Sequence, residues 1–137
     1  MRIVLSIGFP IMAATALAGL LLGCGKNPEP VVEDGLGRSQ LQDIWGLYQL
    51  YIEENKKPPT KLTDAEKYAI GFATGYDAVS AGDYVVEWGV HVGATASPNA
   101  VLAYPKSAPT QGGWVLMRDG NIRKMTADEL KAIIKTK

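Results

Sequence analysis

Two types of reactive side chain occur only once in this chain of 137 residues, as Cys24 and His91. A thiolate is the best side-chain nucleophile near neutral pH, so a lone cysteine suits covalent attachment. It excludes an intrachain disulfide and a multi-cysteine zinc site. A histidine acts as a general base or metal ligand only with partners, and only Glu87, four residues before His91, shares its face of an alternating segment.

Catalytic or metal-ligating roles for His91 and Asp119 compete with simpler structural interpretations. His91 falls on the wetter side of its segment, as a surface residue would. Asp119 precedes Gly120 between two apolar runs, and this pair is typical of a hairpin turn. The chain has no G-x-S-x-G, H-E-x-x-H, P-loop or G-x-G-x-x-G motif. We therefore expect no enzymatic activity, metal site or cofactor. An enzyme that uses two carboxylates brought together by folding stays an alternative.

Cys24 ends a long apolar segment near the N-terminus. No charged residue stands between Arg2 and Lys26, and the apolar run covers residues 3–22. This length suits a membrane-spanning helix, whereas a charged start, an apolar middle and a small-residue end suit a secretory signal. The sequence Leu21-Leu22-Gly23-Cys24 resembles the lipobox of bacterial lipoproteins, with Leu22 larger than is usual there.

The lipobox resemblance implies cleavage between Gly23 and Cys24 and acylation of the Cys24 sulfur and of the new amino group. The protein would then be held in membrane lipid by two or three acyl chains, which together give stable anchoring. Gly25 and Lys26 follow Cys24. Many inner-membrane lipoproteins have an aspartate after the cysteine as a retention signal, and its absence here favours the outer membrane. An uncleaved anchor helix is the main alternative.

A prepilin signal and a structural free thiol fit the N-terminus less well. Gly8-Phe9 matches the prepilin cleavage site, but Pro10 follows and Ala13 replaces the glutamate at the fifth mature position. The stretch after Cys24 is broken by proline and glycine and shows no period. We predict a signal peptide over residues 1–23, a lipidated and flexible tether over 24–38 and a folded domain over 39–137.

The folded domain is predicted to be α+β. Helical spacing of Leu41, Ile44 and Tyr48 predicts a helix over residues 39–55, which Pro58-Pro59 cannot continue. A capping box at residues 63–66 predicts a second helix from Asp64. The other predicted elements are strands over 84–92, 101–104, 113–118 and 121–125 and a helix over 127–135 that a capping box at 126–129 begins. This order favours helices packed on one face of a three- to four-stranded antiparallel sheet.

The C-terminal stretch 108–130 resembles the end of type II secretion pseudopilin-like globular domains of the planctomycete kind. The matching residues are Gly112, Gly113, Val115, Leu116, Asp119 and Gly120. The helix and Lys-Pro-Pro loop over 41–59 are similar to the opening of those domains. The resemblance implies the same fold, but Asn121 replaces a histidine found in some members, and the acidic calcium loop and uncleaved assembly helix have no counterpart.

Three hypotheses about function follow, and the first is the one that we expect. The first is a non-catalytic, lipid-anchored envelope protein, facing the periplasm or the cell surface, that binds another protein. The second is an enzyme of the envelope. The third is a protein that binds a small ligand or glycan through Trp45, Trp88, Trp114 and its tyrosines. The chain carries 14 basic and 14 acidic residues without a basic cluster, which gives no basis for nucleic-acid binding.

Overall fold

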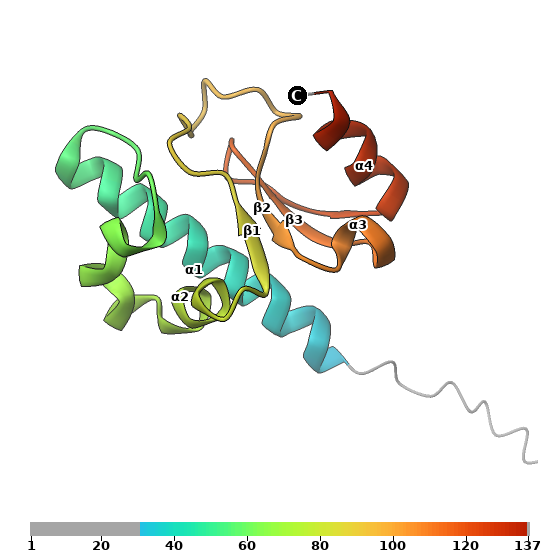
Figure 1. Ribbon diagram of the computed structural model, residues 1–137, viewed down its shortest axis with the longest axis horizontal. Helices are drawn as coiled ribbons and strands as arrows, with labels where there is room; N and C mark the ends of the chain where they lie inside the picture. The colour runs from blue at the N-terminus through green and yellow to red at the C-terminus, as the bar shows by residue number, and fades with distance from the viewer. Residues whose placement is uncertain (1–30, 137) are drawn as a thin grey trace, which may run out of the picture.

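The computed structural model describes residues 31–136, with side chains from residue 35 onward. The predicted signal peptide, its cleavage site at Gly23 and the lipidation site at Cys24 lie outside these residues. Within the described part, no helix is both long and apolar enough to cross a membrane. The structure confirms the predicted α+β class, with helices around a small antiparallel sheet (Figure 1).

The elements follow one another along the chain with few long connections. They are α1 (Val31–Asn55), the 3-10 helix η1 (Leu62–Gly71), α2 (Ala73–Ser80), β1 (Tyr84–Val86), β2 (Val101–Pro105), α3 (Ala108–Gln111), β3 (Gly113–Met117), β4 (Ile122–Met125) and α4 (Ala127–Lys135). The four strands lie in the order β1-β2-β3-β4, and each pairs antiparallel with the next. The short α3, between β2 and β3, has no counterpart in the sequence prediction.

The sheet is covered on both faces, which corrects the prediction that all helices pack on one face. Leu116 of β3 points toward α1 and packs with Leu41, Ile44 and Tyr48. Its neighbour Val115 points the other way and packs with Leu130 of α4. Successive strand residues face opposite sides, so apolar residues at consecutive positions of β3 require a layer on each side.

Helix α1 begins at Val31, so residues 31–38 of the predicted tether are helical. Contacts with the sheet involve this first part of the helix. The Arg38 guanidinium lies 4.9 Å from the centre of the Trp114 ring, and the Tyr84 hydroxyl donates to the Gln40 side chain at 2.9 Å. These contacts join residues far apart in the sequence, so local composition does not reveal them.

The segment after α1 forms two short helices in place of the single predicted one. The predicted capping box of Thr63 and Glu66 is wrong, because the helix begins two residues earlier, at Leu62, and the Asp64 side chain performs the capping. The Asp64 carboxylate accepts from the Thr60 amide and hydroxyl, both at 2.8 Å. Helix α2 then lies close against α1 at Gly75, where an added Cβ would come within 2.7 Å of the Gln40 carbonyl oxygen.

The predicted strand over 84–92 ends at Val86, but its predicted inward face is correct. Tyr84, Val86, Trp88, Val90 and Val92 all pack against the core between α1 and the sheet. Beyond Val86 the chain leaves the ladder, and Gly89 has a φ of +74°. The irregular segment 87–100 is nevertheless fixed, because the Gly89 amide donates to the Pro59 carbonyl and the Gly93 amide to the Arg118 carbonyl.

The hairpin of β3 and β4 is confirmed, but its loop has three residues. The Met117 amide donates to the Asn121 carbonyl at 2.8 Å, and the Gly120 amide donates to Met117 at 3.1 Å. Only Gly120, with φ +90°, has the left-handed conformation, so Asp119 does not need positive φ. This pattern matches a type I turn followed by a glycine bulge. The capping box that begins α4 at Thr126 and Glu129 is present as predicted.

Candidate ligand-binding cleft beside helix α4

His91 and Glu87 do not form the site that their spacing allowed. His91 is exposed on the segment after β1, whereas the Glu87 carboxylate lies 4.0 Å from the Arg118 guanidinium. In the part of the chain with described side chains, no three His, Cys, Asp or Glu residues are grouped to hold a metal ion. One charged partner of Glu87 is therefore an arginine that follows a neighbouring strand of the sheet, and His91 is a surface residue.

Asp119 serves the hairpin. Its carboxylate accepts from the Asn121 amide at 3.0 Å and from the Asn121 side chain at 2.7 Å, with Arg123 at 3.7 Å. Burial alone would raise its pKa, but the hydrogen bonds from Asn121 and the charge of Arg123 together lower it below the ordinary value. An ionised carboxylate held by its own turn has a structural role.

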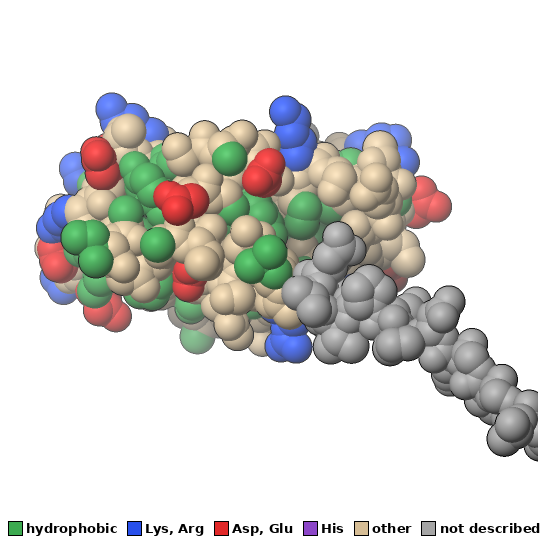
Figure 2. Space-filling model, turned by 90° about the horizontal axis from the view of Figure 1, so that it is seen from below, with side chains coloured by type: hydrophobic (Ala, Val, Ile, Leu, Met, Phe, Trp, Pro, Cys, Tyr) green, Lys and Arg blue, Asp and Glu red, His purple; other side chains and the backbone are tan. Residues whose placement is uncertain are grey.

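The three tryptophans do not form an exposed aromatic platform. All three are half-buried and pack against the core between α1 and the sheet. Trp88 stacks on Tyr48 with ring centres 6.0 Å apart, and the Arg38 and Lys124 cations lie 4.9 Å and 5.7 Å from the centre of the Trp114 ring. Figure 2 shows one face on which apolar, acidic and basic side chains are intermixed. These aromatic rings stabilise the fold and leave little of their faces to stack on a sugar.

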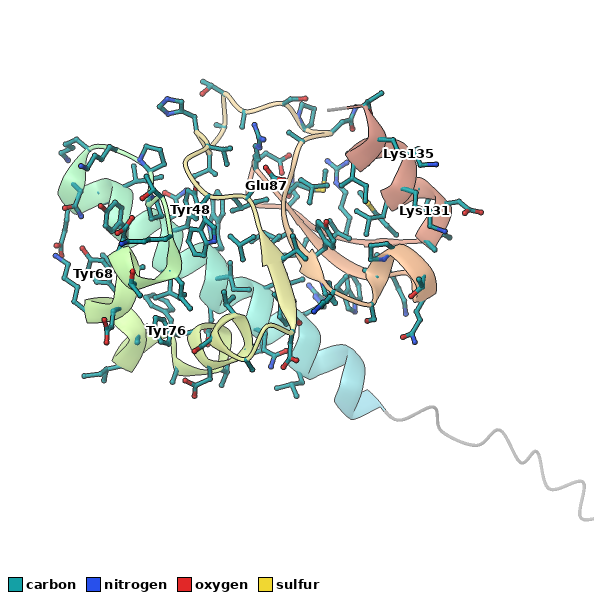
Figure 3. The ribbon with its side chains drawn as sticks, in the orientation of Figure 1. Tyr48, Tyr68, Tyr76, Glu87, Lys131 and Lys135 are labelled. Carbon is teal, nitrogen blue, oxygen red and sulfur yellow. The ribbon has the colours of Figure 1, made fainter. Side chains whose placement is uncertain are left out.

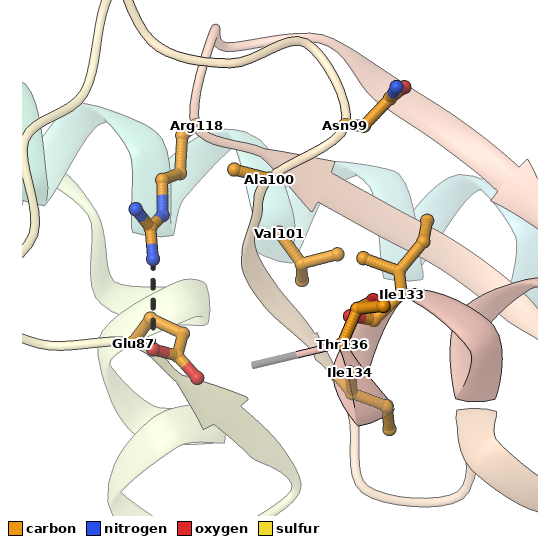
Figure 4. A pocket seen from close by; sticks show the side chains of 8 residues that line it. All are labelled: Glu87, Asn99, Ala100, Val101, Arg118, Ile133, Ile134 and Thr136. Atoms are coloured by element: carbon orange, nitrogen blue, oxygen red, sulfur yellow. Dashed lines mark hydrogen bonds and ion pairs between the residues drawn. The ribbon is translucent and has the colours of Figure 1, made fainter.

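A cleft of about 290 Å³ opens between the sheet and the C-terminal half of α4 (Figure 4). Its charged side is formed by Glu87 and Arg118, and its apolar side by Val101 together with Ile133 and Ile134 of α4. The remaining lining residues are Asn99, Ala100 and Thr136. Ligand sites typically combine apolar walls with a few convergent polar groups, and this cleft has that composition at the small end of the usual size range of about 300–1,000 Å³.

Three different elements place the charged pair. Arg118 directly follows β3, and its amide donates to the Ala100 carbonyl at 2.8 Å just before β2. Glu87 directly follows β1, and its amide donates to the Leu102 carbonyl at 2.8 Å. Because β1 and β3 both flank β2, these backbone bonds bring Glu87 and Arg118 to one end of the sheet.

Tyr48 of α1 holds the backbone beside Glu87 from below. Its hydroxyl accepts from the Val90 amide at 3.0 Å and lies 3.0 Å from the Val90 carbonyl and 3.3 Å from the Glu87 carbonyl, to which it can donate (Figure 3). Burial raises the Tyr48 pKa above its ordinary value, although the hydrogen bond with Val90 and the charge of Arg118 oppose this effect. The hydroxyl therefore stays protonated and fixes the irregular segment that carries Glu87.

Arg118 is incompletely paired. Its side chain is 22% exposed and that of Glu87 29% exposed, and their 4.0 Å contact is too long for a hydrogen bond. The Arg118 Nε–H is buried and has no acceptor among the described residues. A buried donor without a partner costs roughly 1–3 kcal/mol. The arginine thus has capacity to bind an anionic group in the cleft.

The sequence did contain one signal for this arginine. In the alternation of β3, Arg118 has the same parity as Trp114 and Leu116, so a charge falls in line with buried apolar residues. Its pairing with Glu87 had no signal, because the contact depends on β2 lying between two strands distant in sequence.

Comparison of the chain with protein-family models, with curated proteins and with solved structures finds no match.

Proposed function

We propose that this chain is a lipoprotein of the cell envelope whose α+β domain binds a small ligand in the Arg118–Glu87 cleft without catalysing a reaction. The observation that carries the binding role is the cleft itself, in which an incompletely paired arginine and a glutamate face an apolar wall. A site of this composition can orient a ligand by its charged groups and hold it by its apolar part.

The envelope location is supported by the residues around the cysteine. Leu21-Leu22-Gly23-Cys24 ends an apolar segment that follows Arg2, as in a lipoprotein signal. Acyl chains on Cys24 would hold the domain at a membrane surface, in the periplasm or outside the cell, and the outer membrane is the proposed location.

Mass spectrometry of the membrane fraction tests the location. We expect a mature N-terminus at Cys24 that carries a diacylglycerol, and we expect Cys24→Ser to release the chain from acylation. Detection of intact residues 1–23 on the membrane-bound protein would instead establish an uncleaved anchor. A mature N-terminus at another residue would refute lipidation at Cys24.

A non-catalytic role is supported by the environment of the candidate catalytic groups. The Asp119 carboxylate is engaged by Asn121, the only histidine is exposed, and the cleft contains one carboxylate paired with an arginine. General acid–base catalysis needs a group whose proton affinity is matched to its task, usually beside a second such group. The cleft offers a fixed positive and a negative charge, which suit recognition.

Binding in the cleft can be followed by NMR of isoleucine methyl groups in the full chain, held in lipid nanodiscs. Ile133 and Ile134 line the cleft, whereas Ile70 is 97% exposed on η1 and serves as an internal control. We expect some member of a panel of small carboxylates, amines, zwitterions and sugars to shift the two cleft methyls and leave Ile70 unchanged. If no compound shifts Ile133 or Ile134, the proposed ligand-binding role is wrong.

A second candidate function is the binding of another envelope protein, and Ile70 favours it. This large aliphatic side chain is 97% exposed, next to Gly71, which has open space around it. The pseudopilin-like resemblance of residues 108–130 would place such a partner in a secretion or pilus-like system. A photo-crosslinking residue at position 70 should capture one reproducible protein in membranes, with position 66 on the same helix as the control. Equal, non-specific labelling from both positions would contradict this function.

A further inference from the structure

We infer that the ligand of the Arg118–Glu87 cleft is a free α-amino acid with an aliphatic side chain, bound as its zwitterion. This inference rests on the ligand-binding role proposed above and names the ligand class. It follows from three properties of the cleft: two opposite charges side by side, a guanidinium with unused hydrogen-bonding capacity, and an apolar wall facing them.

The spacing of the two charges matches the head group of an amino acid. Arg118 Nη2 and Glu87 Oε2 are 4.0 Å apart, which is the limit of an ion pair and beyond hydrogen-bond length. In an α-amino acid the carboxylate and ammonium groups are attached to the same carbon atom, so they can contact two adjacent protein charges at once. The ligand carboxylate would bind Arg118, and its ammonium group would donate to an oxygen of the Glu87 carboxylate.

The unpaired nitrogen of Arg118 favours a carboxylate over a neutral ligand. A guanidinium binds a carboxylate best through two parallel N–H bonds. The Nε–H is buried and lacks an acceptor among the described residues. A small rotation of the guanidinium toward the cleft would present the Nε and Nη2 edge to the ligand and satisfy this donor.

Charge balance in the cleft selects a zwitterion over a simple acid or amine. Of the eight described residues that line the cleft, only Glu87 and Arg118 carry charge. A carboxylate without an ammonium group would be repelled by Glu87, and an amine without a carboxylate would be repelled by Arg118. At about 4 Å and an effective dielectric constant near 20, either repulsion is large enough to affect affinity.

The opposite wall selects the side chain of the ligand. Val101, Ile133 and Ile134 present branched aliphatic groups, with Ala100 beside them (Figure 4). The volume of about 290 Å³ suits a molecule smaller than a typical drug. Leucine, isoleucine, valine and methionine fit this description, whereas glycine would leave the apolar wall in water.

Calorimetric titration of the unaltered full chain in nanodiscs tests the inference with four ligands. L-leucine should bind. The compound 4-methylpentanoate lacks the ammonium group, 3-methylbutylamine lacks the carboxylate, and glycine lacks the side chain. Charge-assisted hydrogen bonds support an expected loss of about ten- to hundredfold in affinity for each of the first two. Binding of 4-methylpentanoate as tight as that of leucine would overturn the zwitterion inference.

Two variants and a matched control locate the binding. Arg118→Gln and Glu87→Gln should each weaken leucine binding by about ten- to hundredfold. Arg123→Gln also removes one positive charge, but its partner is Asp119 on the hairpin outside the cleft, so leucine affinity should not change. Glu87→Gln should also narrow the preference for leucine over 4-methylpentanoate, which a loss of folding alone would not do.

The outcomes separate this inference from the proposed function. If sugars or simple acids shift the Ile133 and Ile134 methyls but leucine and its aliphatic relatives do not, the cleft binds a ligand and the amino-acid inference is wrong. If nothing shifts them, both fail. If leucine binds with equal affinity to Arg118→Gln, the binding site lies elsewhere and the inference is also wrong.

Discussion

Tyr48→Phe removes one oxygen atom from the core and tests how the cleft is supported. Tyr48 is 1% exposed, and its hydroxyl joins α1 to segment 87–90 through hydrogen bonds with the backbone of Glu87 and Val90. Phenylalanine keeps the ring that stacks on Trp88, so the packing is preserved. The substitution leaves the Val90 amide without its acceptor at 3.0 Å.

The cost of this substitution follows from the stranded polar groups. A buried donor or acceptor that loses its partner costs about 1–3 kcal/mol. For a domain near 100 residues, about 1 kcal/mol corresponds to about 4 °C in melting temperature. We therefore expect Tyr48→Phe to lower the melting temperature by about 4–12 °C, and to weaken ligand binding because the segment that carries Glu87 is less firmly held.

Circular dichroism of the full chain in nanodiscs measures the effect, and Tyr51→Phe is the matched control. Tyr51 lies on the same helix and is half-buried, and its hydroxyl makes no hydrogen bond to another described residue. It should stay within about 0.5 kcal/mol of the parent chain, as most substitutions away from special features do. Equal melting temperatures for the two variants would refute the supporting role of the Tyr48 hydroxyl.

Three further predictions concern stability. Gly75→Ala should lower the free energy of unfolding, measured by urea titration, by about 1–3 kcal/mol, because its Cβ would clash with the α1 backbone. Gly71 has open space around it, so Gly71→Ala should leave the stability unchanged or raise it. Similar losses in both variants would contradict this prediction. Thr126→Ala should cost about 1 kcal/mol by loss of the cap of α4, and Thr126→Ser should restore it. Burial raises the pKa of the Tyr48 and Tyr84 hydroxyls, so the unfolded chain loses these protons at a lower pH than the folded chain does. The free energy of unfolding should therefore fall as pH rises above about 10. A urea midpoint that stays constant from pH 9 to 11 would disprove this.

The parts of the fold that sequence reasoning predicted correctly are those with local causes. The capping box of Thr126 and Glu129 and the hairpin around Gly120 each depend on residues within a few positions of one another. The alternation from Tyr84 to Val92 correctly identified the buried side chains, because burial of one face is expressed residue by residue. It did not reveal that strand pairing ends at Val86, since pairing needs a neighbour.

Most of the errors have non-local causes, and the misplaced cap at Thr63 is a local exception because Asp64 accepts from Thr60, four residues earlier. The first part of α1 contacts the sheet through Arg38 with Trp114 and Gln40 with Tyr84, and these partners are distant in sequence. The second helical layer on the sheet depends on α4 crossing to the face opposite α1, and the same amphipathic pattern would fit either face. The cleft combines both effects, because its charged pair and its apolar wall come from separate segments.

Two physical constraints require the glycine of the β3–β4 hairpin. Gly120 has φ +90°, and an added Cβ would lie 2.7 Å from the Trp45 ring of α1. Both the turn and this close approach require glycine. The glycine of the Asp-Gly pair is thus explained by contacts within this chain.

Helix α1 completes two cores at once, and this has a consequence for how the domain unfolds. One face of the helix packs on the sheet through Leu41, Ile44 and Tyr48, and another packs on η1 through Leu47. Neither the sheet nor the η1–α2 layer can keep its apolar residues from water once α1 is lost. The described domain should therefore behave as one cooperative unit, and a break in α1 would abolish both halves together.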